Sequence, residues 1–392
     1  MMERRLSSRI LRSVEEVSAK SWDACANHCC VDHFSPKETF NPFISHSFLK
    51  SLEISASVGR DSGWQPLFPI IEDDMGNIVA AAPAYLKSHS FGEYVFDATW
   101  AEAYERAGGT YYPKIQIAIP FTPVGGRRLF TTEHQDETLR NLLLKELRLL
   151  REAVKASSLH ITFCNQEEAK YLSASGFASR IGEQFHFTNK NYKTFDDFLN
   201  NLTARKRKMI KKERKEAVSD NISIERLVGK DIKAIHLDRI YYFYMHTNSK
   251  KWGRPYLTRQ FFEAVASEMP DRLLLIMAKR HGAYIAGAIN FLGDMAIYGR
   301  NWGAIEAVPF LHFEVCYYQA IEYAIEYGYA RVEAGAQGEH KLARGYLSTP
   351  TFSVHEFADP LMNDAISHYL SRERKLVSDI VHARSKESPY RF

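Results

Sequence analysis

The feature that most constrains the fold of this chain is an internal repeat. Residues 76–86 read GNIVAAAPAYL and residues 282–292 read GAYIAGAINFL, at an offset of 206 residues. An apolar segment precedes each of them, at 66–73 and at 273–280, with a glycine at the junction. Two apolar segments joined by a short glycine-containing turn are typical of a β-hairpin. We therefore expect the same hairpin in each half of the chain.

A long amphipathic helix and a further strand follow each hairpin. In the first half we expect the helix over residues 136–156 and the strand over 159–164. In the second half we expect them over 309–328 and 330–335. Hairpins alternating with helices are typical of a mixed β-sheet flanked by helices. The sequence therefore predicts a mixed α/β protein built from two related lobes.

The two lobes are expected to be residues 1–190 and residues 191–392. Thr194 and Asp197 form a variant capping box, a pattern that marks the start of a helix, before a predicted helix over 195–218. This helix introduces the second lobe. A length of 392 residues also favours two domains over one.

The composition excludes several classes of protein. A net charge of +4 does not by itself indicate a nucleic-acid-binding protein, and we expect no DNA partner. No run of roughly 18 apolar residues could span a bilayer, and the first residues lack the apolar core of a secretory signal. We therefore expect a cytoplasmic protein with at most peripheral membrane contact. Cys25, Cys29 and Cys30 lack a partner pair at zinc-finger spacing, so we expect reduced structural thiols and no metal site.

A strongly basic segment lies inside the predicted helix over 195–218. Eight of the eleven residues from 205 to 215 are Lys or Arg, and the apolar residues of the helix fall on the opposite face. Two interpretations remain open: a solvated charged face, or a ridge that binds the phosphates of RNA, a nucleotide-linked precursor or a membrane surface. The candidate phosphate contacts are Arg207, Lys208, Lys211, Lys212, Arg214 and Lys215.

Residues 333–347, EAGAQGEHKLARGYL, bring titratable side chains onto a short glycine-rich loop after the last predicted strand of the repeat. Ligands tend to bind at the carboxyl ends of strands in α/β sheets. Lys341 or Arg344 could stabilise an oxyanion or bind a phosphate there, and Glu339 and His340 could act as acid, base or orienting groups. A solvated loop is the alternative, but the density of titratable groups favours function.

Glu314 is a further catalytic candidate. It falls on the aromatic face of the helix predicted over 309–328. Such a carboxylate either accepts hydrogen bonds from Tyr hydroxyls or has a raised pKa suited to proton transfer. The catalytic candidates are therefore Lys341, Arg344, Glu339, His340 and Glu314.

Residues 85–129 of the first half combine many aromatic rings with polar groups, in a stretch that is too polar to be wholly buried. Rigid aromatic rings with a few polar groups are typical of a substrate-binding wall, although packing in the core is the alternative for rings such as that of Trp100. His312, on the polar stripe of its helix, is interpreted as a surface or lip residue. The candidate substrate contacts are Lys87, His89, Tyr94, Asp97, Trp100, Tyr104, Tyr112 and Lys114, with Arg300, Trp302, His312 and Gln337 in the second half.

These motifs together resemble the FemAB-like branch of the GNAT acyltransferase superfamily, and within it the bacterial group labelled as peptidoglycan biosynthesis or recognition proteins. The resemblance rests on the paired lobes, the basic helix and residues 298–328 and 335–347. It implies two tandem GNAT-like lobes with a cleft between them. It also implies transfer of an amino acid from aminoacyl-tRNA to a cell-wall precursor, with Lys341, or Arg344 in its place, supporting the reacting ester carbonyl.

The chain departs from the wider superfamily at the loop that holds acetyl-CoA. That loop reads Q/R-x-x-G-x-G/A, and the nearest match here, residues 300–305, fails at Ile305. The long helical hairpin of some FemAB enzymes also has no counterpart. We therefore expect an acyl or aminoacyl transferase with no certain cofactor, aminoacyl-tRNA as donor and a nucleotide-linked cell-wall precursor as acceptor. The alternatives are a non-catalytic module that recognises cell wall or RNA, and an N-acyltransferase that uses acetyl-CoA or another acyl-CoA.

Overall fold

The computed structural model describes residues 5–27, 40–133, 136–249, 255–335 and 338–391. Its internal contacts divide the chain into two compact units. Unit 1 consists of Met1–Gly182 with Pro350–Asp379, and unit 2 of Glu183–Thr349 with Ile380–Phe392. The lobes expected from the sequence are continuous segments and stay a prediction, whereas these units are discontinuous.

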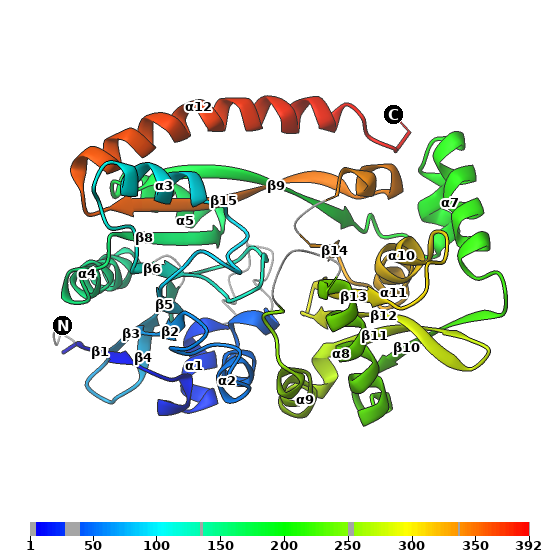
Figure 1. Ribbon diagram of the computed structural model, residues 1–392, viewed down its shortest axis with the longest axis horizontal. Coiled ribbons are helices and arrows are strands. Elements are labelled where there is room, and N and C mark those ends of the chain that lie inside the picture. Colours follow the sequence, from blue (N-terminus) through cyan, green and yellow to red (C-terminus); the bar gives the residue numbers. More distant parts are fainter. Residues whose placement is uncertain (1–4, 28–39, 134–135, 250–254, 336–337, 392) are drawn as a thin grey trace. The chain divides into compact units, whose positions relative to one another are not determined.

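Two β-sheets form the framework of the described part of unit 1 (Figure 1). Their strands are β1 (Ser7–Leu11), β2 (Trp64–Pro66), β3 (Phe68–Glu72), β4 (Ile78–Ala81), β5 (Ala84–Lys87), β6 (Lys114–Ile117), β7 (Phe130–Thr131), β8 (Ser158–Cys164) and most of β15 (Leu347–Phe357). The smaller sheet has the order β1-β3-β4-β7 and is antiparallel throughout. In the other sheet, unit 1 contributes the order β15-β8-β6-β5-β2, in which β6 and β8 are parallel and the other neighbours are antiparallel.

The first predicted hairpin is present, but each of its strands is divided between the two sheets. β3 pairs with β4 in the smaller sheet, and β2 pairs with β5 in the other. The single strand expected over 76–86 is therefore a wrong prediction. The break falls at Ala82–Pro83, where proline offers no N–H to continue the ladder.

The helices of unit 1 are α1 (Ala19–Ala26), α2 (His46–Ile54), α3 (Ala98–Arg106), α4 (Glu137–Ala153), α5 (Gln166–Ala174) and most of α12 (Pro360–Ser385). α4 confirms the helix expected over 136–156. Asp136 begins it by accepting a hydrogen bond from the N–H of Leu139 at 2.9 Å. Leu143 and Leu147 pack with Ile115 and Leu159 in one apolar core, which covers one face of the sheet.

The described strands of unit 2 lie in one sheet, in which the hairpin is not divided. These are the second part of β9 (Ala178–Thr188), β10 (Ile222–Val228), β11 (Leu273–Arg280), β12 (Ala283–Leu292), β13 (Ala296–Ala304) and β14 (Arg331–Glu333). Their order is β10-β11-β12-β13-β14-β9, with β13 and β14 parallel. The second predicted hairpin is confirmed, since β11 and β12 are joined by His281 and Gly282, both at positive φ (50° and 82°).

The helices of unit 2 are α6 (Phe195–Asn200), α7 (Ala204–Ala217), α8 (Ala234–Ser249), α9 (Arg259–Glu268), α10 (Leu311–Phe313) and α11 (Gln319–Glu326). Thr194 and Asp197 form the expected capping box of α6. The prediction of a single helix over 195–218 is wrong, however, because the helix is interrupted between α6 and α7. At the break, the N–H of Thr203 donates to the carbonyl oxygen of Pro389 at 2.9 Å.

The predicted α/β class is confirmed by the mixed sheets and flanking helices of both units. In each unit a helix connects two parallel neighbouring strands: α4 between β6 and β8, and α10–α11 between β13 and β14. Across the described ranges, none of the helices is both long and apolar enough to cross a membrane.

Candidate functional site

A tight turn follows β14 and carries four titratable side chains within six residues: Glu339, His340, Lys341 and Arg344. Residues Glu339–Arg344 form a 3-10 helix between Gly338 (φ 119°) and Gly345 (φ 92°). Left-handed backbone at both ends is what glycine permits and other residues resist. The loop expected from the sequence is therefore a short helix, which fixes His340, Lys341 and Arg344 relative to one another.

Lys341 is buried, with 2% of its surface exposed. Its Nζ donates to the carbonyl oxygen of Gly335 at 2.9 Å and lies 6.0 Å from the ring centre of Tyr317. Burial lowers the pKa of Lys341 to about 8, although the nearby Cys316 thiol acts in the opposite direction. Within the described part of the chain, the hydrogen bond to Gly335 uses one of its three N–H donors.

His340 is exposed beside this lysine. Its Nε2 forms a hydrogen bond with the hydroxyl of Tyr317 at 2.9 Å, and its ring lies 5.5 Å from that of Phe313. Burial of part of the ring lowers the pKa of His340, and the charges of Arg344 and Lys341 lower it further. The imidazole is therefore neutral at pH 7, the form in which it accepts a proton.

Arg344 acts as a fixed support of this turn. Glu213 of α7 accepts from its Nε at 3.0 Å and its Nη2 at 2.7 Å, and the hydroxyl of Tyr318 donates to the same carboxylate. Nη1 donates to the carbonyl oxygen of His340 at 2.6 Å, and the guanidinium lies 3.5 Å from the ring centre of Phe313. All three guanidinium nitrogens are thus engaged, so the geometry favours Lys341 over Arg344 as the oxyanion partner.

Glu213 was not predicted from the sequence. It is the acidic residue inside the basic segment over 205–215, and that isolation was the available signal. In the structure it is buried.

Glu314 is buried at the start of a π-helical turn, Glu314–Tyr318, between α10 and α11. Arg214 of α7 donates to it at 2.9 Å and the side-chain amide of Gln319 at 2.7 Å. The alternative in which Tyr hydroxyls bind this carboxylate is therefore wrong, because a guanidinium and an amide bind it instead. π-Helical turns are frequent at functional sites, and this one carries Cys316 and Tyr317 beside the turn of Lys341.

The remaining candidates of unit 2 differ in how exposed they are. Glu339 is exposed and forms an ion pair with Arg384. His312 is half-buried, and its ring lies 5.1 Å from that of Trp302 and 5.2 Å from that of Tyr317. Arg300 lies on β13, and Gln337 falls outside the described residues.

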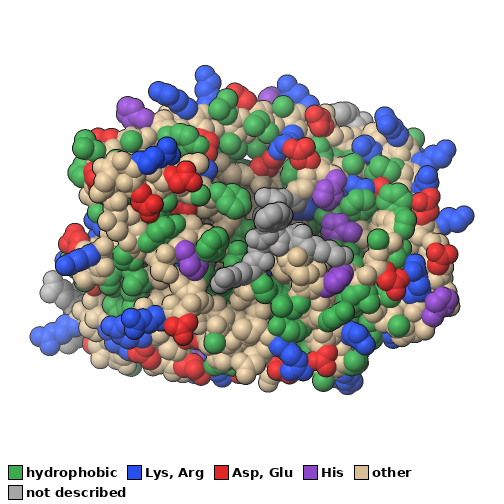
Figure 2. Space-filling view, in the orientation of Figure 1, with side chains coloured by type: hydrophobic (Ala, Val, Ile, Leu, Met, Phe, Trp, Pro, Cys, Tyr) green, Lys and Arg blue, Asp and Glu red, His purple; other side chains and the backbone are tan. Residues whose placement is uncertain are grey.

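The basic segment forms an exposed face of α7, and Lys and Arg side chains gather along the edge of the molecule where α7 lies (Figures 1 and 2). Four of the six phosphate candidates have partners within the protein. Arg214 pairs with Glu314 and Glu322, and Arg207 donates to Asn200 at 3.0 Å. Lys211 pairs with Asp196 at 3.2 Å and Lys212 with Glu216 at 3.5 Å, and both of these pairs are exposed. The four exposed candidates are Lys208, Lys211, Lys212 and Lys215.

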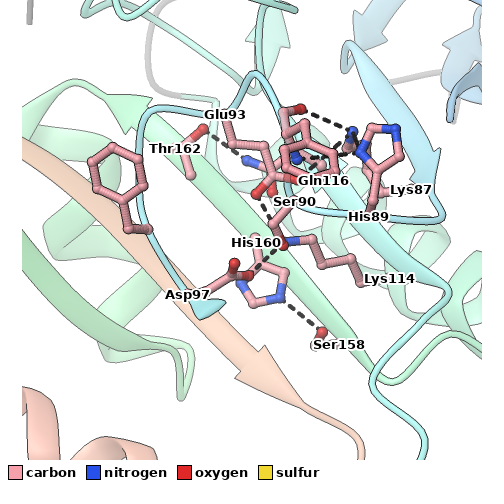
Figure 3. A network of polar contacts seen from close by, with 12 residues as sticks. Lys87, His89, Ser90, Glu93, Asp97, Lys114, Gln116, Ser158, His160 and Thr162 are labelled. Atoms are coloured by element: carbon pink, nitrogen blue, oxygen red, sulfur yellow. Dashed lines mark hydrogen bonds and ion pairs between the residues drawn. The ribbon is translucent and has the colours of Figure 1, made fainter. Parts of the chain in front are cut away.

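In unit 1, several substrate candidates form a buried polar network (Figure 3). Lys114 donates to Glu93 at 2.7 Å and to Ser90 at 2.8 Å, and it also pairs with Asp97. Lys87 lies over the ring of Trp64, 3.7 Å from its centre. Lys87, Asp97 and Lys114 are buried, because opposite charges pair there. Phe91, Tyr94 and Phe96 are exposed, so the stretch is not wholly buried, as its polarity predicts.

The other candidates of unit 1 surround this network. Trp100 is buried and stacks on His160, as the core-packing alternative predicts. Tyr104 donates to Asp359 at 3.3 Å, and Tyr112 shares a hydrogen bond of 2.8 Å with Ser90. His89 and Tyr94 lie closer to the surface. Glu93 was not predicted, although it lies between two named candidates.

Residues 13–392 match the protein family FemAB_like, described as peptidoglycan biosynthesis/recognition. The chain belongs to this family. The resemblance stated from the motifs is therefore confirmed at the level of the family. A search of curated proteins gave no significant match.

Three solved structures share the fold at low sequence identity. FemX has 12% identity and a TM-score of 0.56, with 90% of this chain and 98% of that chain covered. The C-terminal domain of a putative lysylphosphatidylglycerol synthetase from Agrobacterium fabrum has 8% identity and a TM-score of 0.53, covering 93% and 98%. L-PGS from Bacillus licheniformis has 9% identity and a TM-score of 0.51, covering 86% and 98%. At these identities the likeness shows the fold alone.

Residues 300–305, the nearest match to an acetyl-CoA loop, do not form such a loop in the structure. Arg300 and Gly303 lie inside β13 instead of on a loop before a helix. A Cβ at Gly303 would lie 2.1 Å from the carbonyl oxygen of Phe243, so this glycine allows α8 to pack closely on the strand. The glycine of the motif therefore serves helix packing.

Proposed function

We propose that this FemAB-like chain is an aminoacyl or acyl transferase that acylates the amine of a cell-envelope precursor. The observation that carries the proposal is the geometry around Lys341. A buried amine stands on a glycine-bounded turn directly after β14, next to the exposed, neutral imidazole of His340. Membership of a family described as peptidoglycan biosynthesis/recognition supports the choice of acceptor.

In the proposed reaction, an amine nitrogen of the acceptor attacks the ester carbonyl carbon of the donor. A C–N bond forms, and the C–O bond to the donor's hydroxyl group breaks. The ammonium of Lys341 donates a hydrogen bond to the oxyanion that develops on the carbonyl oxygen. His340 takes the proton from the attacking amine and passes it to the leaving alcohol. Arg344 and Glu213 hold the turn, so that both groups are positioned before the reaction begins.

Aminoacyl-tRNA is the proposed donor, as the family resemblance implies. The exposed lysines of α7 could bind the phosphates of tRNA. The same helix carries Glu213, which pairs with Arg344 in the turn of Lys341. Acetyl-CoA is the less favoured donor, because the nearest match to a pyrophosphate loop forms part of β13.

The proposal is tested by transfer of a labelled amino acid from charged tRNA to a nucleotide-linked cell-wall precursor. We expect transfer by the wild-type chain, and a loss of about 100-fold or more for Lys341→Met. The control is Lys145→Met, which removes an exposed lysine of α4 in unit 1. Transfer that survives Lys341→Met would remove the assignment. Binding of the precursor without any transfer would favour the non-catalytic module instead.

A further inference from the structure

One face of the sheet in unit 1 is polar across four neighbouring strands. The register places Lys87 of β5 opposite Lys114 of β6, and Gln116 opposite His160 of β8. His160 in turn lies opposite His355 of β15. The other face of the same strands is apolar and packs in the core with α4. Such alternation usually means that the polar face meets water.

Here the polar face is buried. Lys87 and Lys114 have 0% of their surface exposed, and Gln116, His160 and His355 are also buried. A buried ionic network is weak evidence for stability, since removing charges from water is costly. The arrangement therefore calls for a reason other than packing.

The segment over residues 88–97 closes this face above the two lysines. It contains no helix or strand, and its backbone turns at Gly92 (φ 82°) and Tyr94 (φ 59°). It exposes Phe91 by 66% and Phe96 by 69%. Its inward side chains, Glu93 and Asp97, attach it to Lys114. Hydrogen bonds add to these ion pairs: Trp64 Nε1 donates to the carbonyl oxygen of Phe91 at 3.1 Å, and the hydroxyl of Tyr111 donates to Asp97 at 2.7 Å.

Hydrogen-bonding capacity on this face is not fully used within the protein. Twelve buried side-chain atoms of the described residues find no hydrogen-bond partner, and five of them gather around this face: Tyr85 Oη, Glu93 Oε1, Asp97 Oδ1, Trp100 Nε1 and Gln116 Oε1. Native proteins contain few such atoms, and each one suggests a missing ligand or water. Three of the five are oxygen atoms that only accept hydrogen bonds, so they suit a ligand with N–H donors.

Lys87 is the less satisfied of the two lysines. Its Nζ lies 3.4 Å from both His89 Nδ1 and the carbonyl oxygen of Phe91, and 3.8 Å from Glu93 Oε1. Lys114, by contrast, already has three close acceptors. Burial lowers the pKa of Lys87 to about 7. If Glu93 swings out with its segment, Lys87, Lys114 and Asp97 carry a net charge of one positive unit while Lys87 is protonated. That charge matches a single carboxylate.

We propose that Lys87, Lys114 and Gln116 form a binding site for the C-terminal residue of a peptide, whose carboxylate replaces that of Glu93. The peptide carboxylate pairs with the two lysines. Its amide N–H donates to Gln116 Oε1, and to Asp97 Oδ1 where a second N–H is available. A free amino acid fits less well, because its ammonium group cancels the charge of its carboxylate and leaves the positive charge of the site unbalanced. The site deepens the proposed function, since it gives the acceptor of the transferase a chemical class.

The test is calorimetric titration of the full chain with N-acetylalanine, in L and D forms, and with the corresponding N-acetylalanine amides. We expect saturable binding of the acid in at least one form, and binding of the amides that is weaker by about tenfold or more. Lys87→Met should abolish binding of the acid. Glu93→Gln should strengthen it several-fold, because the competing internal carboxylate is gone. Free alanine should bind more weakly than N-acetylalanine.

The matched control is Glu102→Gln, which removes the same charge from an exposed position on α3 of the same unit. It should retain the affinity of the wild-type chain. Equal binding of acid and amide, or a Glu93→Gln affinity no higher than that of Glu102→Gln, would overturn the site. The Glu93→Gln comparison decides the matter even if Lys87→Met fails to fold. No tRNA or transfer is involved, so failure here would leave the proposed transferase activity standing.

Discussion

Lys341 is the side chain on which the proposed chemistry depends. Its pKa of about 8 means that the amine is largely cationic at pH 7 and becomes neutral only slightly above that. A cation is the form that stabilises an oxyanion. The chemical role of this residue is therefore sensitive to pH in a range that is easily reached.

The first prediction concerns the pH dependence of transfer. Because the folded pKa of Lys341 is lowered to about 8, we expect the rate to fall as pH rises through about 8, where the ammonium is lost. Lys341→Arg should retain some activity without this falling limb, because a guanidinium stays charged. The measurement is single-turnover transfer between pH 6.5 and 9. If the transfer rate of the arginine variant falls with pH in the same way, the fall is caused by a group other than Lys341.

Glu93 gives a second prediction at this scale. Burial raises the pKa of its carboxyl group to about 7, although Lys114 acts in the opposite direction. The folded state then binds more protons than the unfolded state between about pH 4.5 and 7, so this group makes stability fall as pH rises through that window. Relative to Glu93→Gln, the wild-type chain should lose about 2 kcal/mol between pH 5 and 7.5.

Urea unfolding of both proteins at each pH measures this difference. Because the histidines are the same in both proteins, their contributions cancel, whereas the loss of Glu93 also lowers the pKa of Lys87 and adds to the difference in the same direction. A difference in unfolding free energy that does not change with pH would contradict the raised pKa of Glu93.

The sequence allowed part of the candidate site to be predicted. His340 and Lys341 could be found because glycines bound a short segment that is rich in titratable groups. Glu213 was missed: its isolation among basic residues was a signal, but its partner Arg344 lies 131 positions away, so no local pattern gives it a role. Glu93 was missed for a related reason: its burial depends on how residues 88–97 fold back over the sheet, which no local pattern specifies.

At the scale of elements, α7 combines two roles on its two sides. Glu213 and Arg214 face inward and pair with Arg344 and Glu314, whereas Lys208, Lys211 and Lys212 face outward. The sequence correctly predicted an amphipathic helix but treated all the cations as one ridge.

The inward side gives a prediction of stability. Glu213→Ala leaves the buried guanidinium of Arg344 without its partner, and should lower the free energy of unfolding by about 3–5 kcal/mol. The control is Glu216→Ala on the same helix, where the pair with Lys212 is exposed and the loss should be much smaller. Chemical unfolding of both variants is the measurement. Equal losses would mean that the buried pair has no special role.

The outward side gives a prediction of RNA binding. Replacing Lys208, Lys211 and Lys212 together by Gln should weaken binding of tRNA and reduce the slope of log affinity against log salt by about 2. The control replaces three exposed lysines of unit 1, Lys145, Lys170 and Lys375. Filter binding at several salt concentrations measures both. If the two triple variants behave alike, the charge of α7 is a solvated face.

At the scale of the whole molecule, the repeat is the part of the fold that the sequence predicted best. Both halves contain the expected hairpin, helix and final strand, because each is encoded by local periodicity and turn residues. The sequence did not predict the last strand pairing of each unit. β15 pairs with β8 inside unit 1, and the end of β9 pairs with β14 inside unit 2. Such pairings join segments about 190 and 145 positions apart, which no local pattern specifies.

The most direct test of the central claim, an aminoacyl-tRNA-dependent transferase, is a paired titration of the purified chain with aminoacyl-tRNA and with acetyl-CoA. Each titration is made at a low and at a moderate salt concentration. We predict tight binding of aminoacyl-tRNA that weakens steeply with salt, and no saturable binding of acetyl-CoA. Saturable binding of acetyl-CoA, together with tRNA binding no tighter than that of an unrelated polyanion, would contradict the account and indicate an acyl-CoA enzyme.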